Sequence, residues 1–135
     1  MQTFLPYPNI RKSLKALDSR RLGKQRVEAY QILNIILKRT KSSGWKNHPA
    51  VKMWKKHPNA LKFYLNTAIK EWISRGYKNT MSLEIIRGKV VFPIWLGNKK
   101  FHSSHKSNLL KKAPEFYKKL NWNVPSSLPY IWPKD

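Results

Sequence analysis

The chain has 135 residues, and its 28 Lys and Arg residues against 6 Asp and Glu residues give a formal net charge of +22. The lack of cysteine excludes disulfides and thiolate metal sites, and no apolar run could span a bilayer. We therefore expect an intracellular protein of the cytoplasm or nucleoid, or of a viral factory or virion, that is neither secreted nor bound to a membrane. So large a positive charge disfavours a compact chain unless a polyanion compensates it, and nucleic acid is the obvious partner.

Apolar residues recur at helical spacing through most of the chain, which predicts an all-α fold. We expect a compact single-domain helical bundle over residues 1–135, with long loops and an extended aromatic C-terminal tail. Residues 78–98 show no clear periodicity, and residues 90–92 are the one candidate for a brief strand. The expected helices cover residues 10–16, 17–39, 49–54, 58–75, a stretch beginning near residue 102, and a short turn from residue 114 onward.

The predicted helix over residues 17–39 has two different halves. Its first turns carry basic and amide side chains, and Arg26 falls on the same side as Leu33, where a core-facing helix does not normally place an arginine. We therefore expect this half to leave the core and to face a phosphate backbone. Glu28 is the one acid within this basic stretch. The apolar stripe that should pack against the core consists of Leu22, Ala29, Ile32, Leu33, Ile36 and Leu37.

The chain offers few ligands for a metal ion. Its six acids are far apart, which argues against a two-metal site. His102 and His105 lie at i and i+3, a spacing that zinc accepts, but no third ligand is evident nearby. We therefore expect neither a metal nor another cofactor.

An enzyme without a cofactor could use an amine as its nucleophile. An α-amino group is partly unprotonated at physiological pH, whereas a lysine is almost fully protonated. Attack of such an amine on C1′ of a nucleotide displaces the base and forms a Schiff base, and a carboxylate must then move protons. Glu28 is the only acid placed among the residues expected to bind phosphate. Alternatively, Glu28 only pairs with Lys24 or Arg21 on an exposed helix face, a contact worth about 0.3–0.5 kcal/mol.

Six blocks of the sequence carry a resemblance: MQTFLPY (1–7), LDSRRLGKQRVEAYQIL (17–33), GWKNHPAVKMW (44–54), WLG (95–97), FHSSHKSNLLKKAPEFY (101–117) and LPYIWP (128–133). Together they resemble the pyrimidine-dimer DNA glycosylase family, and especially a cellular branch whose members begin MQTFLPYP. The resemblance implies a compact all-α fold with the N-terminus inserted between helices at the active site. It also implies base-excision repair of damaged double-stranded DNA, with pyrimidine dimers as the expected lesion. Glycosylase activity would be coupled to abasic-site lyase (endonuclease) activity by β-elimination.

In that family an N-terminal α-amine and one glutamate carry the chemistry, and the resemblance places these roles on Met1 and Glu28. Members from phage expose the amine of a small residue after the initiator Met is removed. Gln2 is bulky, so we expect the amine of this chain to belong to Met1 itself. Val27 stands where the phage proteins have an arginine beside the glutamate, so lesion preference need not be shared.

The remaining expectations concern DNA contacts and the core. Trp45, Trp54, Trp72 and Trp95 should belong to the core rather than stack on bases. We expect a monomer. A different class of function also fits the charge: a non-catalytic architectural or packaging protein that binds DNA or RNA. The residues expected to contact DNA are Arg20, Arg21, Lys24, Gln25, Arg26, Lys46, His48, His102, His105, Lys106 and two residues of the aromatic tail, Tyr130 and Trp132.

Overall fold

The computed structural model describes residues 1–41 and 44–133, and these residues form helices and loops without a β-strand. The predicted all-α class is confirmed, and the brief strand considered at residues 90–92 does not form. None of the described helices is both long and apolar enough to cross a membrane. The elements are α1 (Ile10–Lys15), α2 (Ser19–Ile36), α3 (Pro49–Trp54), α4 (Pro58–Ser74), α5 (Lys99–Lys112), α6 (Pro114–Tyr117) and a short 3₁₀ helix, η1 (Lys118–Leu120).

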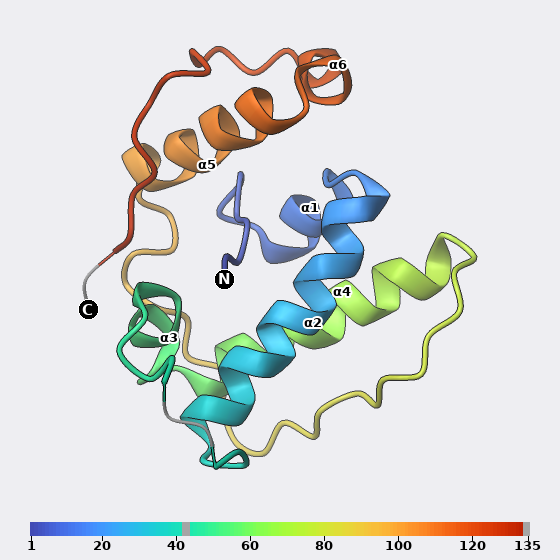
Figure 1. Ribbon diagram of the computed structural model, residues 1–135, viewed down its shortest axis with the longest axis vertical. Coiled ribbons are helices and arrows are strands. Elements are labelled where there is room, and N and C mark those ends of the chain that lie inside the picture. Colours follow the sequence, from blue (N-terminus) through green and yellow to red (C-terminus); the bar gives the residue numbers. More distant parts are fainter. Residues whose placement is uncertain (42–43, 134–135) are drawn as a thin grey trace.

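Helices α2 and α4 cross at the centre of the molecule, where their apolar faces meet (Figure 1). Leu22, Ala29 and Leu33 of α2 are fully buried, as are Leu61 and Leu65 of α4. Each buried leucine contributes about 1.5–3 kcal/mol relative to an exposed one. The buried face of α2 follows the apolar stripe predicted from the sequence, although Ile36 and Leu37 at its end are only partly buried. Both helices lie where helical periodicity predicts them.

The ends of these two helices follow local signals in the sequence. Asp18 caps α2, and its side chain accepts a hydrogen bond from a backbone N–H of the first turn. The helix ends at Ile36, earlier than predicted, and Lys38 just beyond it has a left-handed conformation with φ of 57°. Gly76 follows α4 with φ of 89°, a conformation that glycine adopts without strain.

Helix α5 begins at Lys99, before the start near residue 102 that the sequence suggested. Its cap is Asn98, whose side chain accepts a hydrogen bond from the N–H of Phe101 at 3.0 Å. The earlier start places His102 and His105 within the helix, one turn apart and on the same side. That side faces the N-terminal segment, which lies between α5 and α2 (Figure 1).

The N-terminal segment, residues 1–9, has no regular structure, but its residues 3–6 are packed into the core. Thr3, Phe4 and Leu5 are buried, and the indole N–H of Trp54 donates to the hydroxyl of Thr3 at 3.0 Å. The first residues of the chain are therefore fixed between helices, as the family resemblance implies.

Residues 77–98 form a long connection without helix or strand (Figure 1). A side chain of α4 binds the backbone of this connection. Asn66 pairs with both the N–H and the C=O of Glu84, at 2.7 and 2.9 Å. Arg39, beyond the end of α2, forms an ion pair with the Glu84 side chain at 2.9 Å. Side chains thus satisfy backbone groups that a sheet would otherwise pair.

Candidate functional site

Two histidines of α5 hold the backbone of Leu5, and we call this pair of contacts the Leu5 clamp. The N–H of Leu5 donates to Nδ1 of His105 at 2.9 Å, and its C=O lies 2.7 Å from Nδ1 of His102. Nε2 of His102 accepts from the N–H of Gly97 at 2.8 Å, so the proton of this ring is on Nδ1 and is donated to Leu5. His105 accepts through Nδ1, so its proton is on Nε2. Both rings are neutral in this arrangement.

Burial keeps the two histidines neutral. His102 and His105 are 4% and 0% exposed. Burial lowers the pKa of both, and together with the neighbouring His102 it lowers the pKa of His105 to about 3. Their side chains are turned inward and are not available to DNA, contrary to our expectation. They position the N-terminal segment instead.

Gln25 also faces inward, although we expected it to contact DNA. It is 1% exposed, and its Oε1 accepts from the N–H of Phe4 at 2.9 Å and from the hydroxyl of Tyr64 at 2.7 Å. Its Nε2 donates to Oε2 of Glu28 at 3.2 Å. A buried amide therefore connects the N-terminal segment, α4 and the carboxylate of Glu28.

Glu28 lies where α2 meets the start of the chain. Besides Gln25, the backbone N–H of Gln2 donates to its Oε2 at 3.4 Å. Because Gln2 directly follows Met1, the α-amino group of Met1 lies close to this carboxylate. Burial, followed by the positive charge of that amino group, lowers the pKa of His48, the residue that caps α3. The structure thus brings together the two residues expected to be catalytic.

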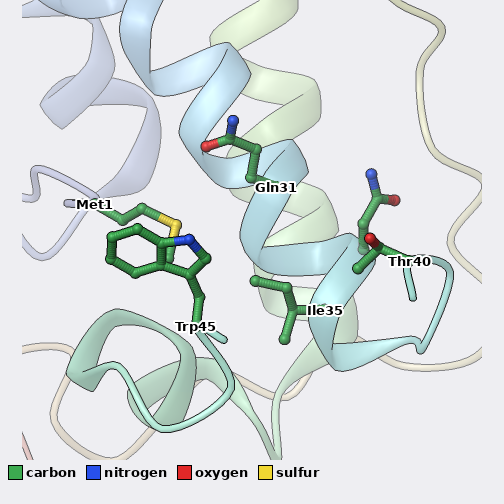
Figure 2. Close-up of a pocket in the computed structure, with 6 residues that line it drawn as sticks. Met1, Gln31, Ile35, Thr40 and Trp45 are labelled. Atoms are coloured by element: carbon green, nitrogen blue, oxygen red, sulfur yellow. The ribbon is translucent and has the colours of Figure 1, made fainter. Parts of the chain in front are cut away.

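A cavity of about 300 Å³ opens beside Met1, between α2 and the loop that precedes α3 (Figure 2). Met1, Gln31, Ile35 and Trp45 lie along its wall. The Trp45 side chain is 55% exposed, so the expectation that it belongs to the core is wrong. A flat aromatic ring at the opening provides a surface on which a base can stack.

The outward face of α2 carries cations next to this site. Arg20 and Lys24 are exposed and lie one turn apart. Arg21 instead pairs with Asp18 at 3.4 Å. Glu28 takes its hydrogen bonds from the N-terminal segment and from within α2, and among the described residues it forms no ion pair with Lys24 or Arg21, the alternative considered from the sequence.

Arg26 turns away from the outward face, contrary to our expectation. Its guanidinium lies over the ring of Trp72, 4.3 Å from the centroid, and donates to Asn79 at 2.9 Å. Gly23 leaves room for this stack, because a Cβ at that position would lie 3.0 Å from the Trp72 ring. Burial lowers the pKa of Arg26. This arginine fastens the start of the 77–98 connection to α2 instead of presenting its charge to DNA.

The other expected DNA contacts divide into exposed and packed side chains. Lys46 is exposed. His48 caps α3, and its ring meets that of Trp132 edge-on, with the centroids 5.5 Å apart. Lys106 lies over an aromatic ring of the N-terminal segment, and Tyr130 stacks on a histidine of the Leu5 clamp. The aromatic tail is therefore packed onto the protein.

Tyr64 is a member of the site that the sequence does not single out. It occupies the buried face of α4, where its spacing is that of an ordinary core residue. Its only signal is its hydroxyl group, which needs a partner when buried. Trp54 and Trp95 are buried as expected, whereas Trp72 is only partly buried. Within the described residues, no three His, Cys, Asp or Glu side chains come together as metal ligands would.

Comparison of the sequence with known protein families gives a match. The family model described as pyrimidine dimer DNA glycosylase matches residues 1–85, which is more than half of the chain. The matched range includes Met1, Gln25, Glu28 and Tyr64, whereas α5 and the C-terminal tail lie outside it. Searches of curated proteins and of solved structures found no match. The chain belongs to the pyrimidine dimer DNA glycosylase family.

Proposed function

We propose that this protein is a DNA glycosylase and abasic-site lyase that acts on pyrimidine dimers in double-stranded DNA. In this proposal the α-amino group of Met1 is the nucleophile and Glu28 is the acid and base. The observation that carries the proposal is the hydrogen bond from the N–H of Gln2 to Glu28, which places the start of the chain beside a carboxylate. Membership of the glycosylase family supports the same conclusion.

The first stage replaces the bond to the base by a bond to the enzyme. The unprotonated amine of Met1 attacks C1′, and the C1′–N bond breaks so that the base leaves with the electron pair. Glu28 takes up the proton that the amine loses after attack. It then gives this proton to O4′ as the C1′–O4′ bond opens, which leaves an iminium ion between the enzyme and C1′.

The second stage cleaves the strand. Glu28 removes a proton from C2′, and the C3′–O3′ bond breaks so that the 3′ phosphate leaves with its electron pair. Water then hydrolyses the conjugated iminium and releases the amine of Met1, and Glu28 loses the C2′ proton to solvent. Glu28 gains and loses a proton in each stage, so the carboxylate must be held in one place throughout. Gln25 and the backbone of Gln2 are suited to hold it.

The arrangement of charge also suits a DNA substrate. Arg20 and Lys24 lie on the outward face of α2, and Lys46 is exposed on the loop before α3. Lysine and arginine side chains at these positions would bind phosphates on either side of the cavity beside Met1. An extruded nucleotide could then bring its C1′ to the amine.

Glu28→Gln tests the proposal, because it preserves size but removes the ability to exchange a proton. We expect cleavage of dimer-containing and abasic DNA to fall by roughly 10²-fold or more, while binding to the same DNA is retained. Glu115→Gln is the matched control, since Glu115 pairs with Lys118 on an exposed surface. Unchanged cleavage by Glu28→Gln would refute the assignment. DNA binding without any cleavage by the natural protein would favour the architectural alternative.

A further inference from the structure

The C-terminal tail is fastened along α5. The N–H of Leu128 donates to the hydroxyl of Ser107 at 2.9 Å, and the N–H of Ile131 donates to that of Ser104 at 3.2 Å. Figure 1 shows this segment returning past α5 toward the start of the chain. These contacts fix the backbone on both sides of Tyr130.

The ring of Tyr130 is packed against residues that hold the N-terminal segment. It stacks on His105 with centroids 4.6 Å apart and planes at 25°, and it meets Phe4 edge-on at 6.4 Å. The N–H of Phe4 in turn binds Gln25, which binds Glu28. Tyr130 therefore belongs to the same packed cluster as the carboxylate.

The hydroxyl group of Tyr130 is buried and has no hydrogen-bond partner among the described residues. Burial and then the negative charge of Glu28 raise the pKa of this phenol, so the hydroxyl is a protonated donor. Native proteins rarely bury a polar group without a partner, and such groups often serve a function. The packing of the ring alone does not account for this hydroxyl.

Glu28 has acceptor capacity that the present contacts leave unused. A carboxylate has about four acceptor positions, and Gln2 and Gln25 both donate to Oε2. If a third donor holds Oε1, the plane of the carboxylate is fixed and one position remains for the nucleotide. Hydrogen bonds of this kind are often long in a free enzyme and shorten when the substrate binds.

We propose that Tyr130 is a positioning residue whose hydroxyl donates to Oε1 of Glu28 when DNA occupies the site. The hydrogen bond fixes the plane of the carboxylate, so that the remaining position of Oε1 faces the sugar. The inference rests on the proposed function, and it gives the C-terminal tail a role in the chemistry that is separate from DNA contact. It also connects a residue outside the matched range 1–85 to a residue inside it.

Tyr130→Phe tests the proposal because it removes only the hydroxyl and keeps the stacked ring. We expect the single-turnover rate on abasic DNA to fall roughly tenfold, the scale of one hydrogen bond to a charged group, with DNA affinity unchanged. The thermal midpoint should stay the same or rise, because a buried hydroxyl without a partner is lost. Tyr77→Phe is the control, since Tyr77 is also a stacked tyrosine, on Trp72, but lies at the end of α4.

The double variant separates positioning of Glu28 from any other role. In the Glu28→Gln background, Tyr130→Phe should cause little further loss of rate, because the group on which it acts is already changed. Equal losses in both backgrounds, a natural rate in Tyr130→Phe, or a loss of DNA affinity in place of rate would each overturn the inference. If the natural protein does not cleave abasic DNA, the proposed function fails and this inference fails with it. Cleavage by Tyr130→Phe at the natural rate would remove the inference alone.

Discussion

The two sides of α2 differ in the kind of residue that they present. The outward side presents exposed cations, Arg20 and Lys24. The side toward the N-terminal segment presents Gln25, and Glu28 lies at the edge of this side, one turn beyond Lys24. Both are fixed by hydrogen bonds, to the start of the chain and, for Gln25, to Tyr64. Exposed cations suit long-range attraction to phosphate, whereas a carboxylate held by hydrogen bonds suits proton transfer at a defined atom.

This difference indicates that binding and chemistry depend on separate groups of residues. Exposed cations act through their charge, so salt screens them and one can partly replace another. The buried side depends on direction and distance, so loss of a single acceptor moves the groups that it holds. Changes on one side of α2 should therefore leave the property assigned to the other side intact.

The largest expected effect in this comparison comes from the Leu5 clamp. His105→Leu removes the acceptor for the N–H of Leu5, so the start of the chain should shift away from Glu28. We expect the rate of Schiff-base formation with abasic DNA to fall at least tenfold, because small displacements at a reacting centre are costly. Affinity for undamaged DNA should change by less than about twofold, because the cations remain in place.

His105→Asn is the control for this variant. The Oδ1 of asparagine can take the place of Nδ1 and accept the N–H of Leu5, so this variant should keep more of the rate. Circular dichroism would verify that both variants remain helical. Equal rates in the two variants would show that the clamp does not position the site.

The next effect concerns the outward side of α2. Arg20→Ala and Lys24→Ala should each reduce the slope of log affinity against log salt by up to about one unit, because each phosphate contact contributes about 0.9. The single-turnover rate at saturating DNA should stay close to that of the natural protein. Lys70→Ala removes the same charge from an exposed position on α4 and should leave the slope nearly unchanged. A slope that is the same in all three variants would refute the proposed phosphate face.

The effect that is smallest at neutral pH is a pH dependence of stability. The pKa of His105 is about 3 in the folded protein and near 6.5 in an unfolded chain. Between these values only the unfolded state binds the proton, so stability falls as the pH drops below about 6.5. The loss approaches about 1.4 kcal/mol per pH unit from this side chain, and above pH 7 the side chain has no effect. Urea unfolding should show a shallower acid loss for His105→Asn, and an identical loss would contradict this assignment.

Much of the fold is readable from the sequence because it depends on local signals. The apolar spacing predicts α2 and α4, and prolines and glycines mark several helix ends. Glu28 stands out because it is the one acid in a basic stretch. The sequence predicts too late a start for α5, because the polar side chain of Asn98, which caps the helix, stands in a loop rich in other possible breaks.

The inner half of the site is not readable in this way, because its partners are distant in sequence. His102 and His105 bind the backbone of Leu5, about a hundred residues earlier, and a backbone partner leaves no pattern in the sequence. The basic neighbours of Gln25 and Arg26 suggest DNA contact for both, but a helix turns adjacent residues to different sides. The partner of Arg26, the ring of Trp72, is distant in sequence, in another helix, and leaves no local signal.

Covalent trapping on abasic DNA tests the central claim most directly. Borohydride reduces the iminium ion to a stable amine, and digestion followed by mass spectrometry locates the modified atom. We predict a single adduct on the α-nitrogen of Met1. We also predict that a few residues added before Met1 abolish the adduct while DNA affinity is retained. An adduct on a lysine side chain, or trapping that survives the extension, would contradict the account.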